Sequence, residues 1–495
     1  MKTFIAILFA RFIRKKNQNW ISNPIEHQQK TFFKLIEKSK NTEFGKDHDF
    51  SEINSYETFK KNVPVRDYEG LKKYIDRVVS GEKNILWPGK PLYFAKTSGT
   101  TSGAKYIPIT KSSIKTHVRS ARDALLNYFL KSKNYKSING KHMFLQGSPE
   151  LIKTNGVFIG RLSGISAHYV PKLFLTNRLP SWKTNCIEDW EEKVDKIIKE
   201  TVGEKMTIIA GIPSWVQMYF EKIVENEKTN ISNVFPELSL YVYGGVSYEP
   251  YKIMFERLFG KKIDTLATFP ASEGFFGYQD EFTDKDPELL LLLNNDIFYE
   301  FIKTEDFING KDLRLSLKSV ELNVNYVLII STSAGLWAYN IGDTIKFTSI
   351  DPYRIIVTGR IKQFLSAFGE HVISEEVEKA LSQTLKNSDI IVKEFTVAPQ
   401  IHPKAGLPHH EWYIDFEIPP KNIKTFSIEL DNHMRRLNIY YNDLVSGGIV
   451  KPLIVKRTKP DDFKNYMRSI GKLGGQNKVP RLSNDRKIVE QLTLY

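Results

Sequence analysis

Amphipathic helical stretches alternate with short apolar runs through the middle of the chain, and this alternation constrains the fold more than any other feature. The helical stretches are KTHVRSARDALLNYFLKS, EDWEEKVDKIIKETVG and SWVQMYFEKIVENEK, and the apolar runs are MTIIAGIP, LSLYVYGG and IDTLATFP. Such alternation is typical of βαβ units, in which helices connect neighbouring parallel strands. We therefore predict an α/β fold with a largely parallel sheet in this region.

The segments on either side differ in character. The first ninety residues read as mostly helical, whereas 296–351 is rich in strand-like runs such as IFYEFI and DTIKFTSI. A chain of 495 residues is too long for one hydrophobic core. We predict a large α/β domain with β subdomains over 1–357, and a small α+β domain over 358–495 that ends in an exposed basic tail.

The net charge and the cysteine count indicate which kind of ligand and which cellular compartment suit the protein. The net charge of +14 is spread along the chain, which suits anionic ligands such as nucleotides. One cysteine, Cys186, excludes an intramolecular disulfide framework and fits a reducing cytoplasm. The segment RRLNIYY mixes basic and aromatic residues, but aromatic residues on an amphipathic helix are usually core. We expect a cytoplasmic protein with no nucleic-acid partner.

The first sixteen residues, MKTFIAILFARFIRKK, are apolar and then basic. A secretory signal would place its charges before the apolar run, and no stretch reaches the roughly 18 continuous apolar residues of a membrane span. Phe4, Ile5, Leu8, Phe9 and Phe12 fall near helical spacing. We predict a helix docked on the protein, and the alternative is a helix with weak peripheral association at a membrane surface.

The segment FAKTSGTTSGAKYIPIT, residues 94–110, has the composition of a phosphate-binding loop. It is not a Walker A motif, because three residues separate Gly99 from Gly103 and Lys105 is followed by Tyr106. Two glycines nevertheless allow close backbone approach, and hydroxyls and one ammonium group can bind phosphate oxygens. The hydroxyl residues are Ser98, Thr100, Thr101 and Ser102. A flexible surface loop is the alternative interpretation.

Three later segments each present one charged residue in a turn or loop. Glu273 lies in TFPASEGFFG directly after an apolar run, where a carboxylate could share Mg²⁺ with phosphates. Asp343 follows Gly342 in AYNIGDTIKF and could accept hydrogen bonds from both hydroxyls of a ribose. Lys478 lies on the Gly-rich segment GGQNKVPRLSND. Taken singly, each also fits a solvated side chain in a turn or loop.

In this order and at these intervals, the segments resemble the acyl acid amido synthetases, the Gretchen Hagen family of auxin-responsive plant enzymes and their bacterial-type members. The motifs are TSGTTSGAKYIP, FPASEGFFG, YNIGD, GRIKQFLSAFGE and QNKVPR, with VPVRDYEGLKKYI and GIPSW in support. The family belongs to the adenylate-forming superfamily with acyl-CoA synthetases and luciferases. The resemblance covers nearly the whole chain and implies a large N-terminal domain with a small mobile C-terminal domain.

The resemblance assigns nucleotide-binding roles to residues of the first three motifs. It implies that the first motif wraps the triphosphate of ATP, that Glu273 holds Mg²⁺ and that Asp343 binds the ribose. It further implies that Phe269 lies against adenine, although the superfamily commonly has Tyr-Gly where this chain has Phe269-Pro270. The other residues assigned to ATP in these motifs are Ser98, Gly99, Thr100, Thr101, Lys105, Ala271 and Ser272.

The remaining motifs receive roles in the same way. Lys478 is implied to orient the carboxylate and the α-phosphate, with Glu273 as the second catalytic residue. Arg360 is assigned to the nucleotide and, with Lys362, to the hinge about which the small domain turns. Gly244 and Gly245 resemble the paired-glycine turn beside the adenine and acyl pocket.

The implied reaction makes a carboxylate reactive. Attack on the α-phosphate of ATP gives an acyl-adenylate and pyrophosphate, and AMP then leaves when an amine, such as that of an amino acid, attacks the acyl carbon. Positioning and charge stabilisation supply most of the rate, so no Ser/His/Asp triad is needed. The alternatives are a thiol acceptor such as coenzyme A, or a non-catalytic nucleotide-binding or membrane-associated protein.

Two further expectations concern the pocket and the histidines. We expect acyl specificity to reside in residues 140–250, with 144–171 as a wall. His402, His409 and His410 are expected at a strand edge and not on a metal, because no spaced carboxylate set accompanies them.

Overall fold

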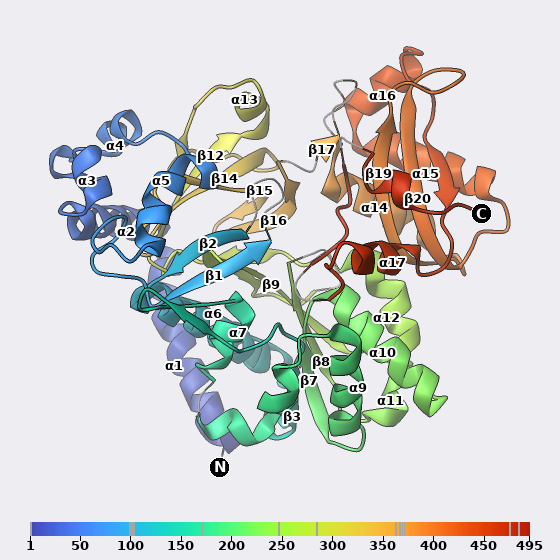
Figure 1. The fold of residues 1–495 in the computed structure, drawn as a ribbon, viewed down its shortest axis with the longest axis horizontal. Helices are drawn as coiled ribbons and strands as arrows, with labels where there is room; N and C mark the ends of the chain where they lie inside the picture. The colour runs from blue at the N-terminus through green and yellow to red at the C-terminus, as the bar shows by residue number, and fades with distance from the viewer. Residues whose placement is uncertain are drawn as a thin grey trace. The chain divides into compact units, whose positions relative to one another are not determined.

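The structure is a computed structural model in which the chain divides into two compact units (Figure 1). The described residues are 2–98, 104–170, 172–245, 248–283, 286–361, 364–365, 368, 370, 372–474, 477–483 and 486–495. The first unit comprises 1–211, 235–245 and 263–356, and the second comprises 212–234, 246–262 and 357–495. Two segments that precede residue 357 in the sequence therefore group with the C-terminal region.

A mixed sheet, to which the described residues contribute twelve strands, forms the framework of the first unit (Figure 1). One half is parallel, in the order β9-β8-β7-β3-β6. Its strands are β3 (Lys141–Phe144), β6 (Arg178–Leu179), β7 (Met206–Ala210), β8 (Leu240–Gly244) and β9 (Asp264–Ala271). The three apolar runs of the sequence are β7, β8 and β9, which confirms the predicted α/β core.

The other half of the sheet is antiparallel, in the order β13-β12-β14-β15-β16-β11-β10. Its strands are β10 (Gly274–Gln279), β11 (Leu289–Leu291), β12 (Ile297–Lys303), β13 (Leu315–Ser316), β14 (Asn325–Thr332), β15 (Tyr339–Ile350) and β16 (Tyr353–Arg360). The predicted β-rich region is confirmed as a series of antiparallel strands. Short connections join antiparallel neighbours such as β9 and β10, or β14 and β15, without a crossover helix.

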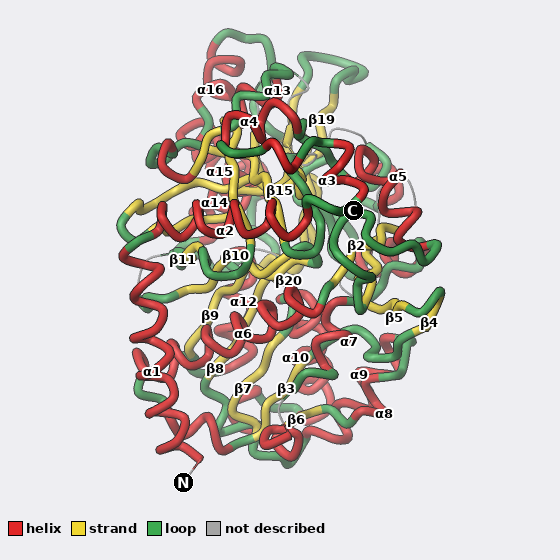
Figure 2. The backbone as a smooth tube through the Cα atoms, turned by 90° about the vertical axis from the view of Figure 1, so that its left-hand side faces the viewer, coloured by secondary structure: helices red, strands yellow, loops and turns green. Residues whose placement is uncertain are grey.

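Helices pack on this sheet and on one another. The described helices of the first unit are α1 (Lys2–Ser22), α2 (Pro24–Ser39), α3 (Glu43–Asp47), α4 (Tyr56–Asn62), α5 (Tyr68–Val79), α6 (Lys111–Ser132), α7 (Leu162–Ala167), α8 (Trp182–Asn185), α9 (Trp190–Thr201) and α13 (Thr304–Ile308). Helix α6 begins with a capping box formed by Thr110 and Ser113. It packs on β9 and β10, and α1 packs against α6 (Figure 2).

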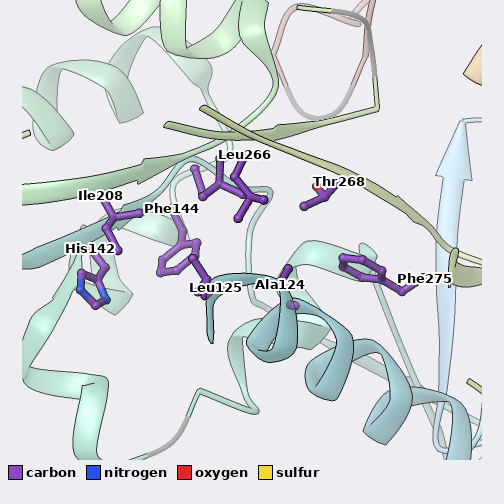
Figure 3. Close-up of a pocket in the computed structure, with 11 residues that line it drawn as sticks. Ala124, Leu125, His142, Phe144, Ile208, Leu266, Thr268 and Phe275 are labelled. Carbon is purple, nitrogen blue, oxygen red and sulfur yellow. The ribbon is translucent and has the colours of Figure 1, made fainter. Parts of the chain in front are cut away.

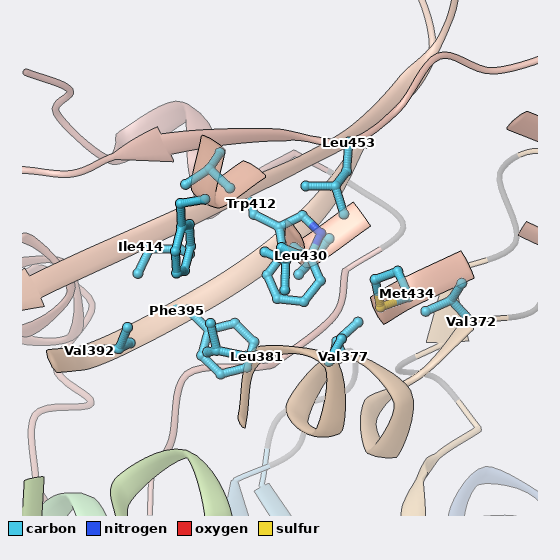
Figure 4. Packing of buried hydrophobic residues seen from close by; sticks show 14 of the residues in the cluster. Val372, Val377, Leu381, Val392, Phe395, Trp412, Ile414, Leu430, Met434 and Leu453 are labelled. Carbon is cyan, nitrogen blue, oxygen red and sulfur yellow. The ribbon is translucent and has the colours of Figure 1, made fainter. Parts of the chain in front are cut away.

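The second unit has a core between a small sheet and two helices. Its described elements are α10 (Pro213–Glu227), α11 (Ile231–Val234), α12 (Lys252–Phe259), β17 (Phe364–Leu365), β18 (Val372–Ile373), α14 (Ser374–Leu385), β19 (Ile391–Gln400), β20 (His409–Ile418), α15 (Ile423–Leu437), α16 (Ile439–Ser446), β21 (Ile454–Arg457) and α17 (Asp462–Ser469). Figure 4 shows Leu381 of α14 and Leu430 of α15 packed against Phe395 and Trp412 of the sheet. The predicted α+β composition is confirmed.

Two consecutive helices of the second unit meet at Asn438. Asn438 ends α15, and its side chain accepts a hydrogen bond from the backbone of Tyr441 to begin α16. Tyr441 is buried as expected for a core aromatic residue, whereas Tyr440 is 54% exposed.

The predicted exposed basic tail is wrong. Ile488, Val489 and Leu492 are buried in a cluster with Phe463 and Met467 of α17. Burial of these three apolar side chains removes their surface from water, which is favourable. This gain in free energy keeps the segment on the protein although basic residues surround it in the sequence.

The histidines of β20 also differ from expectation. Strand β20 is the central strand of the sheet β19-β20-β21, so His409 and His410 are not at an edge. Both are buried, and His410 Nε2 lies 2.9 Å from Glu370 Oε1. A buried imidazole needs a polar partner, and the carboxylate provides it.

Candidate functional site

The predicted phosphate loop joins two strands of a separate small sheet in the first unit. This sheet has the order β2-β1-β5-β4, with strands β1 (Tyr93–Ser98), β2 (Ala104–Ile109), β4 (Ile152–Thr154) and β5 (Val157–Gly160). Ser98, at the end of β1, pairs with Ala104 at the start of antiparallel β2. The loop residues 99–103, with the predicted Gly99, Thr100 and Thr101, lie outside the described residues.

Lys105 is held close to the start of β2. Its ammonium Nζ lies 5.3 Å from the ring centroid of Tyr68, which is a cation–π contact. The hydroxyl of Tyr68 accepts a hydrogen bond from the backbone N–H of Tyr106 at 3.0 Å. Tyr68 thus contacts strand β2 through its hydroxyl and the Lys105 ammonium through its ring, next to the predicted loop.

Ser272 and Glu273 form the tight turn between β9 and β10. Ala271 pairs with Gly274 across the two strands, so these two residues are the whole connection. The carboxylate of Glu273 belongs to a half-buried residue at the end of a parallel strand. Ligands of α/β sheets commonly bind at this end of the strands. The position suits a metal or phosphate contact.

Phe269 lies two residues before this turn in β9. It is only 6% exposed, and its ring packs edge to face on Phe276, with 5.0 Å between the centroids. The side chain therefore belongs to the core of the sheet as well as to the predicted nucleotide-binding motif.

The paired glycines end the neighbouring strand β8. Gly244 pairs with Thr268, and a Cβ atom on Gly244 would lie 2.7 Å from the carbonyl oxygen of Thr268. Gly245 has φ of +81°, a conformation that favours glycine. The hydroxyl of Thr268 donates to the carbonyl of Tyr243 at 2.8 Å. Only residues without a side chain fit here, so the backbone of β8 approaches β9 closely beside the Ser272–Glu273 turn.

A β-bulge in strand β15 interrupts the pairing with β14 at the position of Asp343. Val327 pairs with Thr344 and Ile329 with Asn340, so β15 has two more residues between these pairs than β14 has. The carboxylate belongs to a buried residue that is 7% exposed. Its neighbour Gly342 has φ of +84°, and a Cβ atom there would have no heavy atom of the described residues within 4 Å. The bulge thus contains a buried carboxylate directly after a glycine with positive φ.

Lys478 and Arg360 belong to the second unit. Arg360 is the last residue of β16, and Lys362 lies outside the described residues. Lys478 is exposed, whereas the next residue, Val479, is buried in the cluster with Phe463. The lysine is therefore presented by a segment that is anchored directly after it.

Residues 480–483 bind along strand β19. The N–H of Val397 donates to the carbonyl of Arg481 at 2.9 Å, and the N–H of Ser483 donates to the carbonyl of Val397 at 3.0 Å. The hydroxyl of Thr396 donates to the carbonyl of Pro480 at 2.7 Å. The segment that follows Lys478 is thus paired with the sheet.

Arg481 is a residue of this segment that the sequence interpretation missed. Its buried guanidinium donates to Glu394, to the hydroxyl of Tyr251 at 2.7 Å and to the carbonyl of Phe395 at 3.2 Å. Its Nε lies 3.4 Å from Glu378 Oε1. The only available signal was its place in QNKVPR, three residues after the lysine.

A cavity of about 100 Å³ lies inside the first unit between α6 and strands β3, β7, β8, β9 and β10 (Figure 3). Its wall is almost entirely apolar and includes Ala124, Leu125, Phe144, Ile208, Leu266 and Phe275. Of the predicted wall at 144–171, Phe144 lines this cavity, and most of the remaining wall comes from α6 and from later strands. The lining suits an apolar group, because a charge placed there would lose its hydration.

The polar members of the wall already have partners. The hydroxyl of Thr268 donates to Tyr243, and His142 Nε2 lies 3.1 Å from the carbonyl oxygen of Ser137. Burial lowers the pKa of His142, which favours the neutral ring. Neither side chain therefore places a charge in the cavity.

His117, also missed from the sequence, lies on the same face of α6 as Ala121 and Ala124, which follow it by one and two helical turns. It is 4% exposed, and its Nε2 has no hydrogen-bond partner among the described residues. Burial lowers the pKa of His117 to about 4. The imidazole is therefore neutral at pH 7.

Protonation of His117 predicts a pH-dependent loss of stability. The folded-state pKa is about 4, and the unfolded value is about 6.5, so the contribution to stability is complete above pH 6.5 and is lost as the pH falls to 4. Urea denaturation of the wild type should lose about 3 kcal/mol more between pH 7 and pH 4 than that of His117→Gln. The exposed His402→Gln controls for loss of an imidazole. Parallel pH profiles for wild type and His117→Gln would contradict the assignment.

Comparison with known proteins gives matches along most of the chain. Residues 14–181 match the GH3 family N-terminal domain, 290–360 its central domain and 375–487 its C-terminal domain. The indole-3-acetic acid-amido synthetase GH3.3 of Arabidopsis thaliana is 23% identical, over 94% of this chain and 90% of that protein.

Two solved structures have a similar fold. The GH3.15 acyl acid amido synthetase gives a TM-score of 0.79 at 16% identity, covering 97% of this chain and 95% of that one. A 2-hydroxyisobutyryl-CoA ligase in the postadenylation state gives a TM-score of 0.61 at 12% identity, covering 96% and 91%. The mixed α/β fold with a large N-terminal and a smaller C-terminal domain is therefore that of adenylate-forming ligases.

Proposed function

The chain belongs to the GH3 family, and from this premise we propose that it is an ATP-dependent acyl acid amido synthetase that joins a carboxylic acid to the amino group of an amino acid. One observation carries the proposal. Thr268 lines the apolar cavity and pairs with Gly244. It lies in strand β9, which ends directly before the Ser272–Glu273 turn. A pocket for an apolar acyl group and a turn suited to phosphate or metal contact thus share strand β9.

The chain's residues fit the nucleotide and its metal ion. Mg²⁺ prefers oxygen ligands and usually keeps several waters, so one half-buried carboxylate at a turn, that of Glu273, is enough for a protein ligand. When bound, Mg²⁺ would neutralise negative charge on the phosphates. Asp343, in the bulge of β15, would accept hydrogen bonds from the ribose hydroxyls. The loop that contains Thr100 would bind the triphosphate, with Lys105 adding a positive charge.

The proposed chemistry has two displacements. A carboxylate oxygen attacks the α-phosphorus of ATP, and the bond to the bridging oxygen breaks to release pyrophosphate. A neutral amine then attacks the acyl carbon, the bond to the AMP oxygen breaks, and the amide forms as the amine loses a proton. Lys478, on the small mobile domain of 358–495, would stabilise the charge that develops on the α-phosphate, and Arg360 would contact the nucleotide at the hinge.

The apolar lining of the cavity favours carboxylic acids that are apolar apart from the reacting carboxylate. None of the described residues that line it carries a charge, so an acid with a second carboxylate would be desolvated there without a compensating partner. We propose an aromatic or branched aliphatic monocarboxylic acid as the acyl substrate.

The function is tested by ATP–pyrophosphate exchange with Mg²⁺ across a panel of aromatic and aliphatic acids. Exchange that requires one acid, followed by amide formation with an amino acid, is the expected result. A thioester formed with coenzyme A in place of an amide would favour the thiol-acceptor alternative. Tight ATP binding without exchange with any acid would contradict the proposed catalysis.

Asp343→Ala is expected to weaken ATP binding by about 10- to 100-fold, because hydrogen bonds to a charged group contribute about 1.5–3 kcal/mol. Titration calorimetry measures the dissociation constant directly. Asp351→Ala removes an exposed carboxylate from the turn that follows β15 and provides the matched control. An ATP affinity equal to that of the wild type would exclude the ribose contact.

A further inference from the structure

In the part of helix α1 whose side chains are described, one face packs on the rest of the first unit. The inward residues follow helical spacing and include Ala10 and Ile13, which form a cluster with Leu126 of α6. Asn17 and Trp20 continue the same face, and the indole N–H of Trp20 donates to Asn17 Oδ1 at 3.1 Å. The predicted docked helix is confirmed, and its orientation is fixed by these contacts.

The outward face of α1 is apolar where a docked surface helix is normally polar. Leu8 is 50% exposed and Phe12, one turn later, is 62% exposed. Phe9 is 40% exposed, and its ring lies 5.1 Å from the guanidinium of Arg122. Leu8 and Phe12 therefore form a ridge on the side of the helix opposite to Ala10 and Ile13.

Basic side chains surround this ridge, and acidic ones are absent from its sequence. Arg11 and Lys15 are exposed at positions next to Leu8 and Phe12 on the helical surface, and Lys16 lies on the other flank. The first acidic residue of the chain is Glu26, in α2. An apolar ridge with basic flanks is complementary to an anionic lipid surface.

We propose that α1 is a peripheral docking surface for anionic lipid membranes. Leu8 and Phe12 enter the boundary between headgroups and acyl chains, while Arg11, Lys15 and Lys16 contact lipid phosphates. The inward face of α1 stays on α6, so the protein lies on the membrane. No helix in the described part of the chain is long and apolar enough to cross a bilayer. The inference is independent of the proposed catalytic function.

The test is co-sedimentation of the full chain with vesicles of phosphatidylcholine containing one quarter phosphatidylglycerol. The double variant Leu8→Ser/Phe12→Ser should lower the partition coefficient at least about tenfold, since two apolar side chains lose their burial in lipid. Lys15→Glu/Lys16→Glu should lower it by at least about 25-fold and weaken its dependence on salt, because each basic residue near an anionic surface strengthens binding about fivefold.

The matched control is Ile428→Ser/Ile439→Ser, which removes two side chains that are 61% and 68% exposed on helices of the second unit. It should bind anionic vesicles as the wild type does, and pure phosphatidylcholine should bind none of the proteins. Thermal unfolding checks that each variant is folded without depending on the proposed activity.

Three outcomes would overturn the proposal. The first is absence of wild-type binding to anionic vesicles, and the second is equal binding by the wild type and Leu8→Ser/Phe12→Ser. The third is self-association that this variant abolishes in light scattering while vesicle binding is unaffected. That result would assign the ridge to a contact between two copies of the chain.

Discussion

Replacing Lys478 by alanine is expected to lower the rate of acid-dependent ATP–pyrophosphate exchange by about 10²–10³-fold. The loss arises because a point charge that stabilises the developing charge on the α-phosphate is removed. The side chain is exposed, whereas Val479 after it is buried, so the substitution leaves the packing of the segment intact. The thermal midpoint of Lys478→Ala should therefore equal that of the wild type.

The control for this variant is Lys459→Ala, at an exposed lysine of the same unit. Amide formation from a synthetic acyl-adenylate provides a second readout, since it omits the step in which Lys478 is proposed to act. We expect Lys478→Ala to retain that half-reaction. Pyrophosphate release at the wild-type rate in Lys478→Ala would exclude the proposed role, and an equal loss in Lys459→Ala would show that the effect is one of net charge.

The elements that could be predicted from sequence are those with local signals. Strands β7, β8 and β9 are short apolar runs between amphipathic helices, and Glu273 lies among small residues directly after such a run. The antiparallel half of the sheet and the bulge at Asp343 depend on which strand lies alongside. Residue spacing within one strand does not contain that information, because register is fixed by the partner.

Two buried residues were missed because nothing in the neighbouring sequence marks their surroundings. Arg481 contacts Tyr251, 230 residues earlier, and Glu394, 87 residues earlier. In the sequence, His117 is like any other histidine on an amphipathic helix. Only the fold shows that its Nε2 is buried without a hydrogen-bond partner among the described residues. The closing segment with Ile488 was misread because its basic residues are local in the sequence. The cluster that buries it also contains residues of α17 and of strands β19 and β20.

Arg481→Ala is expected to destabilise the second unit by about 3–5 kcal/mol. The side chain is only 8% exposed, and removing it leaves Glu394 and Glu378, at 15% and 13% exposure, without their shared cation. A buried carboxylate that loses its partner keeps its desolvation cost and loses the compensating attraction. Thermal unfolding measures the effect, and Arg436→Ala, at an exposed arginine of α15, is the matched control.

From the same contacts we infer that Arg481 positions the segment that carries Lys478. Its guanidinium fixes the segment that follows the lysine, and its carbonyl accepts the N–H of Val397 at 2.9 Å. Arg481→Lys keeps one charge but cannot reproduce the contacts with Glu394, Tyr251 and the backbone together. At a temperature well below its unfolding midpoint, this variant should lose exchange activity while its ATP dissociation constant stays unchanged. A purely structural role predicts full activity there, because the folded fraction would be complete, and that result would restrict Arg481 to stability.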